Sequence, residues 1–390
     1  MELLRADRMN GVEEYFLAKA LRGGGYAVKG RELINFGVGN PDLLPPEEVV
    51  NEIAASSKEA ESHKYQPSTG SILFRRKAVE WYNKNFGVEL DYESELISLL
   101  GAKDGIFHIS LAYLNKGDKV FVPDPGYPVY SHTASLMQAV PVQYNLNSAG
   151  RWQVNIKELE EKTAGRVKII WLNSPNMPTG SILEEKTFKA VINFARRNNI
   201  LIVHDNPYSF ILNGSKPFSI LSIKGAKETA VELISLSKTY NMQGFRIAIA
   251  AGNAGVLDAI GRTKSITDSG GYLPIQHSAV KALAMKKGWV KKLNGIYAER
   301  KKEVEIMARM LGCETGTNNA GMFVWAKLPG NGNDVEFYAD LLKRAGILVT
   351  PGSVYGKNGK GHIRISLCQP VEKIKIAQER INNLIKGKVC

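Results

Sequence analysis

The feature that most constrains the fold is the alternation of short apolar runs with segments of helical periodicity between residues 97 and 251. In one such segment, apolar residues recur at the i, i+3, i+4 and i+7 positions from Phe188 to Ala195. Strands that alternate with helices are typical of an α/β domain with a largely parallel sheet. The expected strands are Ile97–Leu100, Val120–Val122, Ile169–Leu172, Ile200–Val203 and Leu233–Ile234.

A polar cluster follows each of these apolar runs. In open α/β sheets, ligands bind at the edge formed by the carboxyl ends of the strands. Five coincident clusters therefore predict one binding site at that edge. In chain order, the clusters are Gly101-Ala102-Lys103, Pro123 to Tyr127, Asn173 to Asn176, Asp205 to Tyr208, and Ser235 to Lys238.

The last cluster carries the most specific chemistry. Two hydroxyls precede Lys238, and the guanidinium of Arg246 follows it. Hydroxyl donors and a forked positive charge suit a phosphate dianion, so the lysine amine is expected near a phosphorylated aldehyde. The alternative is an ordinary solvated loop lysine.

Composition limits the class of protein. A length of 390 residues predicts two domains, and 44% hydrophobic with 23% charged residues is typical of a soluble globular protein. No apolar run is long enough for a membrane span, and the charged N-terminus does not resemble a secretory signal. Cys313, Cys368 and Cys390 lack metal-ligand spacing, so we expect no metal and a cytoplasmic location. The net charge of +13 comes from scattered lysines, which argues against nucleic-acid binding.

The C-terminal part of the chain has a different pattern. A long helical region is expected from Pro274 to about Leu311, followed by strands interleaved with a helix near Asp334 to Ala345. This order predicts a smaller α+β domain. Arg364 lies in an otherwise apolar strand, where an arginine needs either an anionic ligand or a structural carboxylate. Near the N-terminus, helix is expected up to about Lys29.

Together these motifs resemble the class I/II aminotransferases, which have the fold type I of pyridoxal-phosphate (PLP) enzymes, over about residues 10 to 385. The resemblance implies a large α/β domain with a mostly parallel sheet between helices, plus a smaller α+β domain. The implied division is 1–46 for an N-terminal arm and part of the small domain, 47–280 for the PLP-binding domain, and 281–390 for an interdomain helix and the C-terminal small domain.

The resemblance also implies roles for individual residues. Lys238 would form a Schiff base with PLP and move the substrate proton, and Asp205 would keep the pyridine nitrogen protonated. Tyr208 would bind the cofactor's 3′ oxygen. The other implied contacts are Gly101, Ala102, Lys103, Ser235, Ser237 and Arg246 at the phosphate, Tyr127 against the ring, Tyr65 from the neighbouring subunit of a homodimer, and Gly39 and Arg364 at the substrate carboxylate. From the residues alone, two alternatives stay open: Gly39 lies in an ordinary turn, and Tyr127 is an ordinary core tyrosine.

One position departs from the family. The usual Asn-Pro-Thr-Gly motif reads Met177-Pro178-Thr179-Gly180 here, and methionine has no donor for the 3′ oxygen. Three alternatives remain open: Asn176 substitutes, a water substitutes, or Tyr208 acts alone.

The expected function is transfer of an amino group between an amino acid and a 2-oxo acid, with 2-oxoglutarate as the expected acceptor. A PLP-dependent lyase or decarboxylase would share all of these residues. A non-enzymatic effector-binding module is a further alternative, although no fused DNA-binding segment is recognisable.

Overall fold

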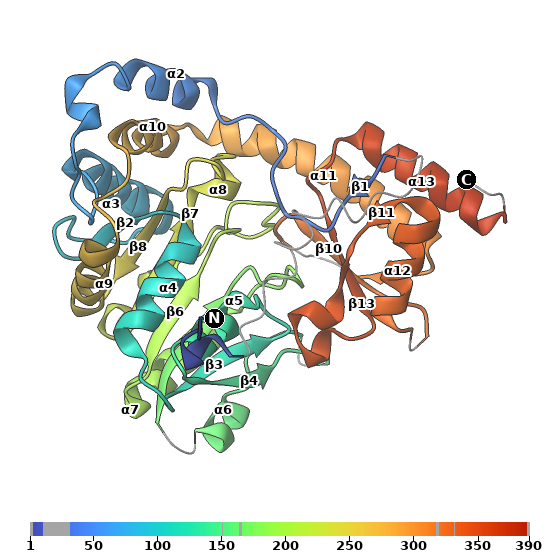
Figure 1. Ribbon diagram of the computed structural model, residues 1–390, viewed down its shortest axis with the longest axis horizontal. Coiled ribbons are helices and arrows are strands. Elements are labelled where there is room, and N and C mark those ends of the chain that lie inside the picture. The colour runs from blue at the N-terminus through green and yellow to red at the C-terminus, as the bar shows by residue number, and fades with distance from the viewer. Residues whose placement is uncertain are drawn as a thin grey trace.

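The structure is a computed structural model, and it describes residues 3–10, 32–149, 151–163, 166–316, 320–330 and 332–387. Most of the helix expected up to Lys29 lies outside the described residues. Figure 1 shows two parts: a large sheet with helices on both faces, and a smaller group of strands and helices near the C-terminus. The long helix α11 runs from the first part to the second.

The large sheet has seven strands in the order β2-β8-β7-β6-β5-β3-β4. Strand β8 is antiparallel to both of its neighbours, and the other pairings are parallel. The predicted α/β class with a largely parallel sheet is therefore confirmed. The strands are β2 (Leu96–Leu99), β3 (Lys119–Asp124), β4 (Val140–Asn145), β5 (Val167–Asn173), β6 (Leu201–Asp205), β7 (Ala230–Ser235) and β8 (Ala248–Gly252).

Both faces of this sheet are buried. Along β5, Ile170 and Leu172 enter one apolar cluster, whereas Ile169 and Trp171 enter another on the opposite face. A strand buried on both faces reads as a continuous apolar run, which is the pattern in the sequence. One face is covered by α3 (Ile72–Phe86), α6 (Ile156–Lys162), α7 (Glu185–Asn198) and α10 (Leu273–Ala284), and the other by α4 (Ala102–Tyr113), α5 (Val129–Leu136) and α9 (Ala254–Thr267).

The small domain is built on antiparallel strands in the order β12-β13-β10-β9. A separate parallel pair joins the N-terminal strand β1 to β11, so residues 34–35 pack with the C-terminal part of the chain. A third apolar cluster fills this domain. Its strands are β1 (Ile34–Asn35), β9 (Glu314–Thr315), β10 (Phe323–Lys327), β11 (Ile347–Leu348), β12 (Thr350–Pro351) and β13 (His362–Ser366), and its helices include α12 (Asp334–Ala345) and α13 (Val371–Ile385).

The prediction of one long helical region from Pro274 to Leu311 is wrong in its continuity. The chain forms α10 and then α11 (Lys287–Met310), with extended backbone at Met285 and Lys286 between them. Helix α10 packs on α2 (Glu47–Ser56) and α3, whereas α11 packs on α13. The break therefore lies where the chain passes from the large sheet to the small domain.

Candidate active site

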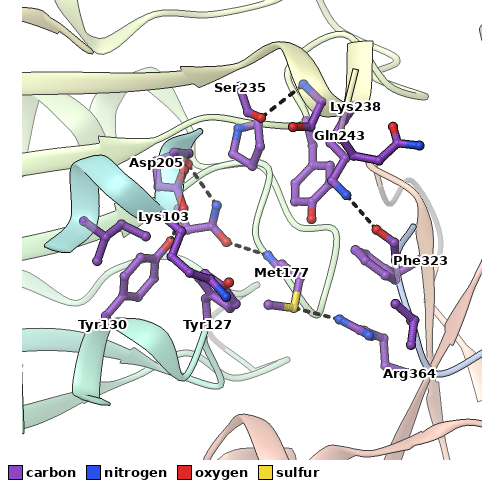
Figure 2. Close-up of a pocket in the computed structure, with 18 of the residues that line it drawn as sticks. Lys103, Tyr127, Tyr130, Met177, Asp205, Ser235, Lys238, Gln243, Phe323 and Arg364 are labelled. Carbon is purple, nitrogen blue, oxygen red and sulfur yellow. Dashed lines mark hydrogen bonds between the residues drawn. The ribbon is translucent and has the colours of Figure 1, made fainter. Parts of the chain in front are cut away.

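The five polar clusters converge on one cavity of about 480 Å³ at the carboxyl edge of the large sheet (Figure 2). Each cluster contributes at least one lining residue, and the small domain closes the cavity with Phe323 and Arg364. The strands β2, β3, β5, β6 and β7 point in the same direction, so their ends meet along this edge. The charged residues that line the cavity are Lys103, Asp205, Lys238, Arg246 and Arg364.

Lys238 lies on α8 (Leu236–Thr239), the single helical turn that follows β7. The hydroxyl of Ser235 caps this turn by accepting a hydrogen bond from the Ser237 amide at 3.2 Å. The Lys238 Nζ donates to the carbonyl oxygen of Gly39 at 2.6 Å. Burial lowers the pKa of the lysine amine to about 8, and the nearby guanidinium of Arg364 acts in the same direction. About a tenth of this amine is therefore neutral at pH 7, far more than for an ordinary lysine, and is able to act as a nucleophile or base.

Gly39 is held close to this lysine by the small domain. An added Cβ at Gly39 would lie 2.4 Å from the Phe323 ring, so only glycine allows this approach. The structure thus places the glycine at the cavity rather than in a remote turn.

Asp205 ends β6 and points into the cavity (Figure 2). Its Oδ2 accepts a hydrogen bond from the Tyr130 hydroxyl at 2.6 Å. Its Oδ1 is buried and has no hydrogen-bond partner among the described residues. Burial raises the pKa of this carboxyl to about 6, although the bond from Tyr130 lowers it. A buried carboxylate with one free oxygen is suited to accept a hydrogen bond from a positively charged donor.

Two tyrosines form the wall beside this carboxylate. Tyr127 lines the cavity and meets Tyr130 edge-on, with ring centroids 5.5 Å apart. Tyr130 in turn stacks on Trp171 at 4.8 Å. Sequence reasoning missed Tyr130, although its spacing of three residues from Tyr127 is a weak signal that both side chains face the same way.

The N-terminus of α4 forms a positively charged cradle. Gly101 precedes this helix with a φ of +91°, and an added Cβ would lie 2.0 Å from Nη2 of Arg246. Arg246 donates to the carbonyl oxygens of Gln243 at 2.9 Å and Leu100 at 3.2 Å, which fixes its guanidinium beside the helix. Burial, followed by the charge of Arg246, lowers the pKa of Lys103. Two cations at a helix N-terminus suit a phosphate.

Arg364 lies on β13 and is only 1% exposed. Its Nη2 donates to the Gly37 carbonyl oxygen at 2.5 Å, and its Nη1 lies 3.1 Å from the Met177 sulfur. The Phe323 ring packs against the guanidinium at 4.1 Å. Among the described residues no carboxylate pairs with it, so the structural alternative for this arginine finds no support.

The structure bears on one of the three alternatives for the 3′ oxygen, the substitution by Asn176. Met177 lines the cavity, whereas Asn176 does not. The Asn176 Oδ1 instead accepts bonds from the amide and hydroxyl of Thr179, at 3.2 and 2.8 Å. The expected cofactor contact of Asn176 is therefore not supported, because its side chain lies outside the cavity lining, although its Nδ2 has no partner among the described residues. Asn173, predicted as part of the third polar cluster but given no role of its own, lies in the cavity and donates to the Asp205 carbonyl oxygen at 2.9 Å.

Tyr208 lines the cavity and packs edge-on against Phe323. Ala102, Ser235 and Ser237 line it as well. Tyr65 lies elsewhere, with 91% of its surface exposed.

Comparisons with known proteins agree with this fold. The family model for class I and II aminotransferases matches residues 31–381. An LL-diaminopimelate aminotransferase of Halothermothrix orenii is 37% identical over 380 residues, which are 97% of this chain and 98% of that protein. Among solved structures, substrate-bound BacF from Bacillus subtilis has a TM-score of 0.93 at 29% identity, covering 98% of each chain. A probable N-succinyldiaminopimelate aminotransferase from Thermus thermophilus has a TM-score of 0.87 at 31% identity, covering 95% of this chain and 100% of that one.

The fold and the cavity are those of a PLP-dependent transferase. The chain belongs to the class I and II aminotransferases and is a PLP-dependent aminotransferase. The residues present fit the cofactor: the α4 cradle suits its phosphate, and the free Oδ1 of Asp205 suits its protonated ring nitrogen. None of the described helices is both long and apolar enough to cross a membrane.

Proposed function

We propose that this enzyme moves an amino group between LL-diaminopimelate and 2-oxoglutarate, with PLP attached to Lys238. The relative from H. orenii bears the name of this activity and matches nearly the whole chain. The structural observation that carries the proposal is that Lys238, the unpartnered oxygen of Asp205 and the buried Arg364 all open into one cavity.

Arg364 is the proposed anchor for the substrate's α-carboxylate. Among the described residues, its terminal nitrogens contact the Gly37 carbonyl oxygen, the Met177 sulfur and, at 3.4 Å, the Thr350 hydroxyl, which are all uncharged acceptors. A carboxylate is a stronger partner for a guanidinium, because both N–H groups can donate to it in parallel. Burial of Arg364 raises the benefit of pairing its charge.

The proposed cofactor contacts follow from the same geometry. Lys103, Arg246 and the α4 N-terminus would hold the phosphate, together with Ser235 and Ser237. Tyr127 would cover a face of the ring. Asp205 would accept a hydrogen bond from the protonated ring nitrogen. When bound, PLP supplies an acceptor for the electrons released at the substrate's α-carbon.

Lys238 is proposed to act twice. It would hold the cofactor covalently until the substrate's amino group takes its place, which would leave the lysine amine free. The free amine takes the proton from the α-carbon, and its pKa of about 8 suits a base that works near neutral pH. Tyr208 is proposed to donate its hydroxyl to the 3′ oxygen, as Met177 offers no donor.

We also propose that the enzyme is a cytoplasmic homodimer in which Tyr65 reaches the neighbour's phosphate site. The 91% exposed ring of Tyr65 supports this proposal, because a large aromatic side chain is then available to another subunit.

We further propose that the chain divides into 1–46, 47–280 and 281–390. The boundary between the second and third parts lies near the C-terminal end of α10, shortly before the break that precedes α11.

Cofactor absorbance tests the substrate assignment directly. The loaded enzyme should convert its cofactor to the aminated form within single turnovers when mixed with LL-diaminopimelate. L-Lysine lacks the distal carboxylate and L-2-aminopimelate lacks the distal ammonium, so both should react more slowly. Rapid conversion by L-glutamate without any conversion by LL-diaminopimelate would refute the proposed donor and leave the aminotransferase class intact.

A further inference from the structure

A second cavity, of about 520 Å³, lies away from the active site. It is bounded by α3, by the loop around Phe210 and Pro217, by Tyr240 just after α8, and by the junction of α10 with α11. Figure 1 shows α3, α10 and the start of α11 on the same side of the large sheet. A volume of this size is in the range of small-molecule sites, roughly 300–1,000 Å³.

The floor of this cavity is aromatic and fixed in place. The Trp81 Nε1 donates to the Tyr240 hydroxyl at 3.0 Å, which satisfies the buried polar atom of the indole. The rings of Trp81 and Phe210 lie 5.3 Å apart. Leu283, Met285 and Val290 complete an apolar surface. Such a floor is suited to bind a small molecule with a flat, apolar ring system.

The rim of the cavity is positive. Five exposed lysines line it, and no aspartate or glutamate does. None of the five pairs with a carboxylate of the described residues, whereas Lys281 and Lys301 nearby do pair, with Glu52 and Glu305. The five rim lysines are Lys84, Lys216, Lys286, Lys287 and Lys291.

The start of α11 adds to this positive potential. The helix has 24 residues, begins at Lys287, and has no side-chain cap at Lys286. Its first amides and the positive end of its dipole therefore face the same region as the lysines. Like charges collected around an apolar floor repel one another unless an anion lies between them.

We propose that this cavity binds a small organic anion with a flat apolar body, such as an aromatic carboxylate or phosphate. The body packs on the Trp81 and Phe210 rings, and the anionic group lies among Lys287, Lys291 and the other rim lysines. An occupant also contacts Tyr240, two residues beyond Lys238. The site is thus distinct from the catalytic cavity and adjoins the segment that carries the catalytic lysine.

The test uses the cofactor-loaded enzyme, so that the active site is filled. The probe is 8-anilinonaphthalene-1-sulfonate, an aromatic anion, and its fluorescence is followed during titration. N-Phenyl-1-naphthylamine has the same rings without the charge and serves as the matched neutral probe. We expect saturable binding of the anion at one site, tighter than binding of the neutral probe and weaker at high salt.

Two variants locate the site. Lys287→Gln combined with Lys291→Gln removes two charges one helical turn apart, and affinity for the anion should fall about fivefold or more. Lys292→Gln, one residue further along α11 and outside the cavity lining, should leave it unchanged. The lysines are exposed, so none of these changes should affect folding. Absence of saturable binding, equal affinity for both probes, or equal losses in the double variant and Lys292→Gln would overturn the proposal.

Discussion

Two side chains in the active site have pKa values that burial shifts toward the neutral form. Burial raises the pKa of the Asp205 carboxyl to about 6 and lowers the pKa of the Lys238 amine to about 8. A cationic ring nitrogen beside Asp205 would restore its ionised form, because an opposite charge favours the carboxylate. We therefore propose that the unpartnered Oδ1 of Asp205 is the atom through which the chain controls the cofactor's ring.

Asp205→Asn removes this charge while keeping the size of the side chain. We expect turnover to fall about a thousandfold or more, since roughly 4 kcal/mol of transition-state stabilisation is lost and about 1.4 kcal/mol is tenfold. Cofactor methylated on the ring nitrogen carries a permanent charge and should restore part of the rate in the variant. Near-normal turnover, or no gain from the methylated cofactor, would show that Asp205 has only a structural role.

Met177 is a second residue whose identity has a measurable consequence. Met177→Asn places an amide donor in the cavity, which should lower the pKa of the cofactor linkage read by absorbance. The shift should reach up to about one unit, because a net hydrogen bond is worth about 1 kcal/mol and one pKa unit about 1.36 kcal/mol. Met177→Leu offers no donor and is the control, with an unchanged titration. A pKa that stays constant or rises in Met177→Asn would place the methionine away from the 3′ oxygen.

The site residues with unusual chemistry could be predicted from the sequence, and the ordinary ones could not. Lys238, Asp205 and Arg364 stand out because a charged residue directly follows or interrupts an apolar run. Tyr130 reaches the same cavity and was missed, because a tyrosine on a helix is common everywhere, and Asn173 was predicted only as a member of a polar cluster, without a role. Their roles depend on contacts across the chain, which a single sequence does not contain.

At the scale of elements, a charge network around the buried Lys264 lies behind α4, next to the proposed phosphate cradle. The Asp104 Oδ2 accepts from the Leu100 amide at 2.9 Å and from the Lys264 Nζ at 3.2 Å. Lys264, on α9, is 1% exposed and also donates to Asp268 at 2.8 Å. Burial opposes ionisation of Asp104, but its bond from His108 and the charge of Lys264 lower its pKa to about 2. This network ties the turn before α4 to α9.

Lys264→Met should loosen that turn. Removing the ammonium leaves the half-buried Asp104 and Asp268 without their shared partner, and because both carboxylates still reach water the cost in the free energy of unfolding should be about 1–3 kcal/mol. Affinity for PLP should fall about tenfold, while affinity for pyridoxal, which has no phosphate, should change little. Arg262→Met removes an exposed ion pair on the same helix and is the control. An equal loss for both ligands would mean that the network supports the whole fold and not the cradle.

Element boundaries show where sequence patterns lose their predictive power. Strand β4 was not predicted, because it lies at the edge of the sheet and only Tyr144 along it is buried. The break between α10 and α11 was missed, because Met285 and Lys286 are good helix formers. Packing of α10 and α11 on different domains outweighs that local preference.

At the scale of the molecule, the active site lies between a large sheet and a small domain, and the proposed homodimer adds a residue from a second chain. The Tyr65→Asp and Lys238→Ala subunits should each be nearly inactive alone. Co-assembled, they should recover about a quarter of wild-type activity, because half of the dimers contain one complete site of two. Activity no higher than that of the separate variants would place Tyr65 outside the neighbour's site.

The central claim is that Lys238 carries the cofactor. Reduction of the loaded enzyme with borohydride fixes the cofactor on its lysine, and peptide mapping identifies the residue. We expect the pyridoxyl group on Lys238 alone, with no label in Lys238→Ala and the label still on Lys238 in Lys103→Gln, which removes the other lysine of the cavity. A label on Lys103 or on any lysine outside the cavity would contradict the account.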